Sequence, residues 1–147
     1  MKPIFIENRE ISQNVSPFII AEMSGNHNQS FDRAVKLIEA AAKTGVHAIK
    51  FQTYTADTMT LNISRDDFLI SDPKNLWNGR NLYELYDEAH TPWDWHESLF
   101  NHVKKLGMIP FSSPFDKTSV DFLERLGVPC YKVASFECTD LPLVGYI

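Results

Sequence analysis

Residues 43–53 read KTGVHAIKFQT, and they join the end of one expected element to the start of the next. Lys43 and Gly45 are typical of a helix C-terminus, because a basic residue complements the helix dipole and glycine accepts the left-handed conformation that ends a helix. The residues after the glycine, 46–53, form an apolar run of the length of a strand. The stretch therefore predicts a helix followed directly by a strand.

The same boundary recurs twice, at residues 105–108 (KLGM) and 125–128 (RLGV). An amphipathic run precedes each boundary and an apolar run follows it. The helix starts are expected at Ser30 as a cap, at Thr91 as a cap with Pro92 in the first helical position, and at Asp116. The expected apolar stripes are Ala34, Val35, Leu37, Ile38, Ala41 and Ala42, then Leu99, Phe100, Val103 and Leu106, then Val120, Leu123 and Leu126.

Strands are expected at residues 18–23, 46–53, 108–112 and 130–134. They alternate with the helices, and alternating strand and helix units imply a parallel sheet. Because residues 24–30 contain one glycine, the phosphate-binding fingerprint of a Rossmann unit is missing. The sequence favours the α/β class and, within it, the N-terminal half of a (β/α)₈ TIM barrel.

Two segments interrupt this rhythm. Residues 54–90 are polar and far longer than the roughly two to six residues of an ordinary strand-to-helix loop, which indicates a functional loop or a lid. Residues 1–16 are compatible with a short hairpin or a cover, and the sequence does not decide between them.

The composition is that of one ordinary globular domain, with 147 residues, 44% hydrophobic and 22% charged. A net charge of −5, without a long run of like charges, gives no footprint for nucleic acid or an anionic membrane. No stretch approaches the roughly 18 apolar residues of a membrane span, and no signal peptide is evident. We therefore expect a cytoplasmic protein, with Cys130 and Cys138 as reduced thiols because they lack metal or redox spacing.

Polar residues end each expected strand, and in a parallel barrel they meet at one rim, where barrel enzymes keep their chemistry. Strand alternation places Ile49 and Phe51 against the helices and turns Lys50 and Gln52 inward. The same rule turns Lys132 inward on the fourth strand. The rim residues are Glu22, Ser24, Asn26 and His27, then Lys50, Gln52 and Tyr54, then Ser112 and Ser113, then Lys132, Ser135 and Glu137.

Lys50 and Lys132 lose several kcal/mol of hydration inside apolar strands unless a negative group compensates them. An anionic ligand meets that need, and so does an ion pair with Glu22 or Glu137. Both interpretations remain open.

Other polar residues also have structural alternatives. Ser113 and Ser135 could bind a ligand, or cap a helix or turn. His27 could be a surface residue, a core residue or a ligand. The aromatic residues expected mainly to pack the long segment and the second helix are Trp77, Tyr83, Tyr86, Trp93 and Trp95.

Four ordered motifs resemble the N-terminal half of sialic acid synthases: IAEMSGNHNQS at 20–30, IKFQTY at 49–54, FSSPF at 111–115 and YKVASFE at 131–137. The long segment is similar to that of the pseudaminic acid synthase branch of this family, through DTMTLN at 57–62, LYELY at 82–86 and TPWDWH at 91–96. The similarity covers nearly the whole chain from Phe18, and four motifs in order are far more specific than any one of them.

The resemblance implies condensation of phosphoenolpyruvate with an N-acetylated amino sugar, here a 2,4-diacetamido-trideoxy hexose. The product is pseudaminic acid, a nine-carbon sialic-acid-like sugar, and phosphate is released. A divalent metal, usually manganese, assists in that family. Lys50, Ser113, Lys132 and Ser135 match positions that hold the phosphate and carboxylate of phosphoenolpyruvate, and Gln52 and Glu137 match sugar-contacting positions. The candidate catalytic residues are accordingly Glu22, Lys50, Lys132 and Glu137, and the candidate substrate-binding residues are Asn26, His27, Gln52, Ser113 and Ser135.

Two features depart from the family. Asn28 stands where sialic acid synthases carry a glutamate, a proposed base for water, and an amide cannot act as a base. Glu22, Glu137 or the substrate phosphate could take that role. The family's barrel has eight strands, with metal-binding histidines in its second half and an antifreeze-like domain after it. We therefore expect residues 1–147 to be a partial barrel domain that is inactive alone, with its metal ligands elsewhere and a homodimer formed by the full-length protein.

Two other functions remain open. One is an N-acetylneuraminate synthase that acts on N-acetylmannosamine, and the other is a non-catalytic half-barrel that binds sugar phosphates.

Overall fold

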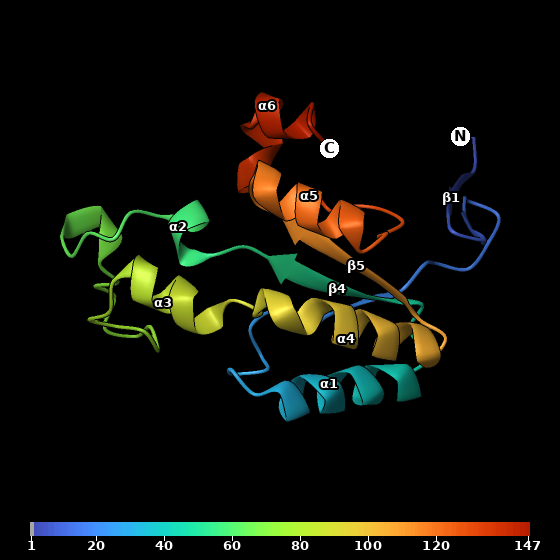
Figure 1. Cartoon of the computed structure of the whole chain (residues 1–147), viewed down its shortest axis with the longest axis horizontal. Coiled ribbons are helices and arrows are strands. Elements are labelled where there is room, and N and C mark those ends of the chain that lie inside the picture. The colour runs from blue at the N-terminus through green and yellow to red at the C-terminus, as the bar shows by residue number, and fades with distance from the viewer. Residues whose placement is uncertain (1) are drawn as a thin grey trace.

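A computed structural model describes residues 2–147 as strands and helices that largely alternate along the chain (Figure 1). The strands are β1 (Ile4–Ile6), β2 (Arg9–Ile11), β3 (Ile20–Glu22), β4 (Ala48–Thr53) and β5 (Ile109–Pro114). The α-helices are α1 (Phe31–Lys43), α2 (Ala56–Met59), α3 (Leu82–Ala89), α4 (Trp93–Lys105), α5 (Lys117–Arg125) and α6 (Leu141–Val144). Two 3₁₀ turns, η1 (Asp66–Phe68) and η2 (Phe136–Thr139), complete the set.

The central sheet is parallel, in the order β3-β4-β5, as the alternation of strands and helices predicts. Its register pairs Glu22 with Lys50 and Gln52 with Ser113. This arrangement is the barrel-type order of strand, helix and neighbouring parallel strand. The α/β class and the partial barrel are therefore confirmed.

The strand predicted at 130–134 is wrong in extent, because only Tyr131 pairs with β5, through a single bridge to Ser112. The Lys132 N–H donates to the Ser112 carbonyl oxygen. The next residue of β5 that faces this side is Pro114, which has no N–H to donate. The chain then turns into η2, so the fourth strand is shortened by a proline in its neighbour.

Helix starts follow the sequence at α1 and α5 but not at α4. Ser30 caps α1 by accepting from the Arg33 N–H, and the Asp116 carboxylate caps α5. At α4 the cap position belongs to Pro92, and the helix begins at Trp93. The prediction that Thr91 caps this helix is wrong, because its buried hydroxyl contacts His27 instead.

Helix ends match the repeated boundary signal. Gly45, Gly107 and Gly127 have φ of 77°, 80° and 64°, the left-handed conformation that glycine adopts without strain. Leu106, expected in the apolar stripe of α4, is instead exposed because it lies just beyond the end of that helix.

The core lies between the outer face of the sheet and the helices, and Figure 1 shows α1 and α4 side by side along that face. Ile49 and Phe51 point into this core, as predicted. Its other fully buried members include Ala34, Ile38, Leu99, Phe100, Val103 and Leu123. Ala48, Ile109 and Phe111 form a smaller cluster on the opposite face, which corresponds to the lumen of a barrel.

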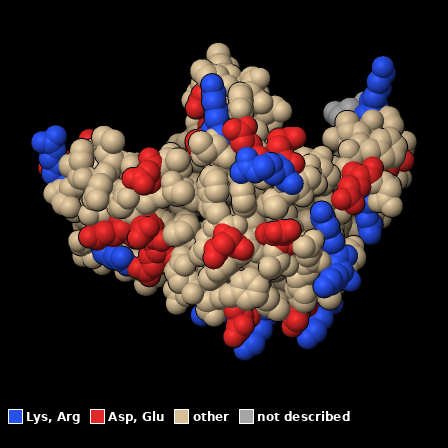
Figure 2. Space-filling view, viewed as in Figure 1, with Lys and Arg blue, Asp and Glu red and all other residues tan. Residues whose placement is uncertain are grey.

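The two irregular segments lie at opposite ends of the strands (Figure 1). The carboxyl ends point toward residues 54–90, which contain α2, η1 and α3 and are therefore more ordered than a plain loop. Near the amino ends, β1 and β2 pair as an antiparallel hairpin, one of the two forms compatible with the sequence. Figure 2 shows acidic and basic side chains mixed over the visible face.

Cys130 and Cys138 are both free thiols. Within the residues that the structure describes, no helix is long and apolar enough to cross a membrane.

Candidate functional site

An open cleft of about 670 Å³ lies at the carboxyl ends of the strands. One side of it, which we call the polar wall, is formed by residues after β3, at the end of β4 and after the Tyr131 bridge: Asn26, Asn28, Gln52, Lys132 and Ser135. The other side, which we call the aromatic wall, comes from the long segment: Tyr54, Met59, Trp77, Leu85 and Tyr86. The cleft therefore brings together four of the nine predicted site residues, namely Asn26, Gln52, Lys132 and Ser135.

The sheet register explains the polar wall. Gln52 pairs with Ser113, and both lie on the lumen face because Phe51 and Ser112 point the other way. Ser113 is 1% exposed, and its hydroxyl oxygen has no hydrogen-bond partner among residues 2–147. A buried polar group without a partner costs about 1 to 3 kcal/mol. Such a group beside the cleft fits a ligand-binding position better than a cap.

Lys50 is held by an ion pair. Its ammonium nitrogen lies 3.5 Å from Glu22 Oε1, and the two side chains are 6% and 60% exposed. The ion-pair interpretation is thus the one seen in this structure, with Glu22 as the partner. Because the Glu22 carboxylate is mostly exposed to water, the ion pair does not exclude an additional anion near Lys50. The role of Lys50 in anion binding stays a prediction.

Lys132 is placed by its two neighbours. Tyr131 points outward, where it packs against the main core and its hydroxyl donates to the Glu124 carboxylate. The next residue therefore turns toward the lumen, and Lys132 lines the cleft together with Gln52. Its inward placement, expected from alternation, is confirmed.

His27 lies in the core and is not part of the cleft surface. It is fully buried; its Nδ1 accepts from the Gln29 N–H and its Nε2 lies 3.1 Å from Thr91 Oγ1. Burial, with a smaller contribution from His90, lowers the pKa of His27. Of the three alternatives for this histidine, the structure shows the core residue.

Glu137 stands in η2, just after the cleft residue Ser135. Its Oε2 is buried without a hydrogen-bond partner in the described part of the chain. Glu22 pairs with Lys50, whereas this oxygen of Glu137 has no partner, and neither residue is among those that line the cleft.

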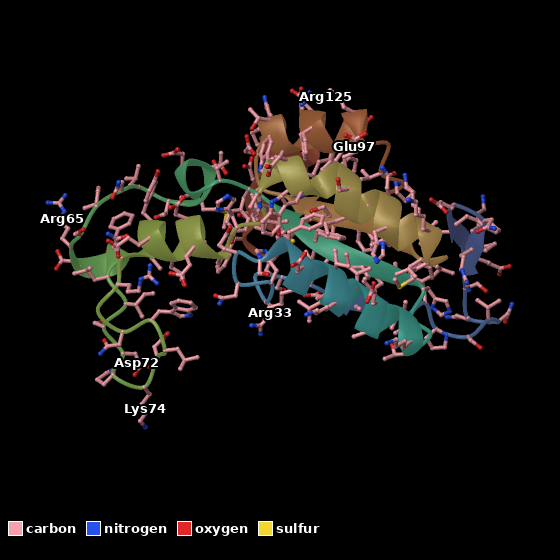
Figure 3. All side chains as sticks on the ribbon, turned by 60° about the horizontal axis from the view of Figure 1, so that its bottom comes forward. Arg33, Arg65, Asp72, Lys74, Glu97 and Arg125 are labelled. Atoms are coloured by element: carbon pink, nitrogen blue, oxygen red, sulfur yellow. The ribbon has the colours of Figure 1, made fainter. Side chains whose placement is uncertain are left out.

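Sequence reasoning missed several residues that shape the site. Arg33 lines the cleft from the first turn of α1, and Figure 3 shows it beside the start of that helix. Its position three residues after the Ser30 cap was the available signal. Trp77 and Tyr86 line the cleft as well, whereas Trp93 stacks on Phe122 at 4.7 Å between ring centres, which fits its expected packing role.

No group of three or more His, Cys, Asp or Glu side chains within residues 2–147 is arranged to hold a metal ion. These residues do not fit the metal that the family resemblance implies. The expectation that the metal ligands lie elsewhere stays a prediction.

The family model described as "NeuB family" matches residues 37–147. The chain belongs to the NeuB family. It is 50% identical over 130 residues to the pseudaminic acid synthase of Campylobacter jejuni, covering 88% of this chain and 37% of that protein. It is 46% identical over 128 residues to the pseudaminic acid synthase of Helicobacter pylori, covering 87% of this chain and 37% of that protein.

A solved relative has the same fold. The N-acetylneuraminic acid (sialic acid) synthetase of Leptospira borgpetersenii, solved in complex with citrate, matches with a TM-score of 0.80 at 26% identity, over 99% of this chain and 45% of that one. The resemblance to sialic acid synthases is thereby confirmed. This NeuB-family chain spans about 37% of the length of the pseudaminic acid synthases that it matches.

Proposed function

We propose that the complete gene product condenses phosphoenolpyruvate with a 2,4-diacetamido-trideoxy hexose, forming pseudaminic acid and releasing phosphate. The observation that carries the proposal is the cleft itself. A cationic and amide-lined wall faces an aromatic wall, in a chain 46% identical or more to pseudaminic acid synthases. The polar wall suits the anion, and the aromatic wall suits a sugar rich in methyl groups.

The anion needs local compensation, because the chain carries a net charge of −5. Phosphoenolpyruvate has up to three negative charges, and charge-assisted hydrogen bonds are about twice as strong as neutral ones. Lys132 supplies a cation on the cleft surface, and Ser113 supplies a buried hydroxyl without a partner. Lys50 can add a second cation when its exposed partner Glu22 swings away into water.

In the proposed reaction the enol carbon C3 of phosphoenolpyruvate bonds to the aldehyde carbon of the sugar, and the aldehyde oxygen takes up a proton to become a hydroxyl. Water loses a proton as its oxygen adds at C2. The C2–O bond to phosphate then breaks, and the new C2 hydroxyl gives up its proton to leave the keto group. The lysines and serines hold the phosphate and carboxylate, while the Gln52 amide orients the sugar. Glu137 is our candidate for taking the proton from water, because its buried oxygen is unpaired whereas Asn28 carries an amide.

N-acetylneuraminate synthase is the second candidate, and the match to a solved sialic acid synthetase favours it. Its substrate, N-acetylmannosamine, presents one acetamido group and a free hydroxymethyl. The 2,4-diacetamido-trideoxy sugar presents two acetamido methyls and a deoxy methyl. Trp77, Leu85 and Met59 on the aromatic wall fit the second sugar better.

The test uses the complete gene product with phosphoenolpyruvate, manganese and each sugar in turn. Phosphate release and the mass of the nine-carbon product are measured, and the mass in solution checks the expected homodimer. We expect turnover with the diacetamido sugar to exceed that with N-acetylmannosamine. The reverse preference would support the sialic acid synthase, and phosphoenolpyruvate binding without any turnover would support the non-catalytic alternative. The 147-residue chain assayed alone should show no turnover.

A further inference from the structure

A buried hydrogen-bonded chain crosses the outer face of the sheet, directly behind the polar wall. His96 of α4 places its Nε2 2.9 Å from Thr53 Oγ1, at the end of β4. Thr53 Oγ1 lies 2.7 Å from Ser112 Oγ in β5. All three side chains are fully buried, and none lines the cleft.

The donor and acceptor in each hydrogen bond can be assigned by starting from the contact between His96 and the Pro92 carbonyl. His96 Nδ1 lies 3.1 Å from the Pro92 carbonyl oxygen, which can only accept, so Nδ1 carries the ring proton. Nε2 is then an acceptor, and the Thr53 hydroxyl must donate to it. The Ser112 hydroxyl in turn donates to the Thr53 oxygen. Burial lowers the pKa of His96 to about 4, which keeps this single neutral form at physiological pH.

The position of this chain relates it to the cleft. Thr53 is the residue after Gln52, and Ser112 is the residue before Ser113. Gln52 and Ser113 are register partners that face the lumen, while Thr53 and Ser112 face the helix. The hydrogen bonds of Thr53 with Ser112 and His96 therefore hold together the ends of β4 and β5, which carry the lumen-facing Gln52 and Ser113.

A second buried histidine ties the first loop to the end of α3 and to the connection that leads into α4. His27 Nδ1 accepts from the Gln29 N–H, so its Nε2 carries the proton and donates to Thr91. Gln29 also donates through Nε2 to the carbonyl oxygens of Glu88 and His90. The loop held in this way carries Asn26 and Asn28 onto the polar wall.

We propose that His96 and His27 are positioning residues, which hold the ends of β4 and β5 and the first loop so that the polar wall meets its anion in a fixed geometry. The test by enzyme turnover assumes the proposed function. The test by spectroscopy depends only on the hydrogen bonds described above.

The experiment compares Thr53→Val with Thr53→Ser in the complete gene product. Valine keeps the shape of threonine but loses the hydroxyl, whereas serine keeps the hydroxyl. A misplacement of about 1 Å at a reacting group can cost roughly a hundredfold in rate, so we expect Thr53→Val to lower kcat by about ten- to a hundredfold. Thr53→Ser should restore most of it.

Val103→Ala is the matched control, because it removes apolar volume from the same core near the C-terminal end of α4, where the Val103 carbonyl oxygen accepts from Met108 just before β5 begins. Its melting temperature is measured beside that of Thr53→Val, and all assays run well below both. The control should keep its kcat. An equal loss of kcat in the two variants, or no rescue by serine, would overturn the inference.

Nitrogen-15 spectra of the histidine rings supply a readout that needs no turnover. We expect His96 as the Nδ1–H form in the unmodified protein and in Thr53→Ser, and a changed Nε2 signal in Thr53→Val. If the unmodified protein does not condense the substrates, the proposed function fails while these spectra, with titrations of phosphoenolpyruvate, still decide the inference. If Thr53→Val changed neither the histidine spectra nor the affinity for phosphoenolpyruvate, the inference would be wrong. Should Thr53→Val not fold, Ser112→Ala and Thr91→Val test the two arms separately by the same measurements.

Discussion

The two walls of the cleft are built in different ways. The polar wall stands on strand ends, whose spacing is set by backbone register and by the buried bonds behind it. The aromatic wall stands on a segment held by side-chain contacts, partly within residues 54–90 and partly to the residue after β5 and the first residue of α4. Tyr54 meets Tyr86 and Phe115 edge to face, with ring centres 5.8 Å and 5.4 Å apart, and the Trp93 indole donates to the Tyr54 carbonyl.

The contrast teaches which wall can vary. The polar wall depends on backbone register, which changes little when side chains change, and in the proposed function it binds the anion. The side chains of residues 54–90 that line the cleft lie outside the sheet register, so they can change without changing strand pairing, and in the proposed function they contact the sugar. Arg65 and Lys74 point away from the body at the far end of this segment (Figure 3), whereas Trp77 and Tyr86 of the same segment line the cleft.

The largest expected effect is on the polar wall. Replacing Lys132 or Lys50 with methionine should weaken phosphoenolpyruvate binding by about 2 kcal/mol or more, roughly thirtyfold, because a charge-assisted partner is lost. Calorimetric titration of the complete gene product measures this, with the exposed Lys105→Met as a control of equal charge change. Unchanged affinity in both cleft variants would remove the lysines from the site.

A second prediction tests how the polar wall is held. The pKa of His96 falls from 6.5 to about 4 in the folded protein, with burial as the largest cause. Between those values the unfolded chain binds the proton and the folded one does not, so stability rises with pH through this window. We expect up to about 3 kcal/mol to be lost as pH falls from 6.5 to 4.

Urea unfolding between pH 4 and 7.5 measures that loss. His27 contributes in the same direction, because burial lowers its pKa too. The His96→Asn variant should lose most of the change in unfolding free energy with pH. This holds whatever the substitution does to stability at neutral pH. A dependence as steep as before would assign the effect to other groups.

A third prediction concerns the aromatic wall. Trp77→Ala should raise KM for the sugar by about tenfold, the effect of losing roughly 1.4 kcal/mol of apolar contact, and should leave phosphoenolpyruvate affinity unchanged. Leu76→Ala is the matched control, because Leu76 is the next residue along the chain and is 96% exposed. A loss of phosphoenolpyruvate affinity in Trp77→Ala would show that the two walls are not separable as proposed.

Sequence patterns predicted what local chemistry decides. The caps at Ser30 and Asp116 and the inward turn of Lys132 follow from residues close in the chain, and the structure confirms them. Thr91 has the residue type of a cap, but its hydroxyl meets His27, 64 residues away, and no local pattern shows that partner.

The remaining differences also arise from contacts distant in sequence. The short fourth strand follows from Pro114 on the neighbouring strand, a signal that becomes readable only once the register is known. The partner of Lys50 stayed open for the same reason, since Glu22 and Glu137 satisfy the pattern equally well and only the sheet order brings Glu22 to 3.5 Å. The aromatic wall depends on packing of residues 54–90 with one another and with Phe115 and Trp93, and this packing has no sequence period to recognise.

The smallest effect is expected at Asn28, the residue that departs from the sialic acid synthases. Its side chain lines the cleft, but an amide cannot take a proton from water, so Asn28→Ala should leave most turnover intact. Steady-state kinetics of the complete gene product measure this, and Glu137→Gln is the informative comparison because it removes the carboxylate that we propose as the base. A loss beyond about a thousandfold in Asn28→Ala, as large as a general base usually contributes, would make Asn28 central. If Glu137→Gln also kept full turnover, the substrate phosphate would remain as the group that takes the proton, and the polar wall would serve to bind and orient alone.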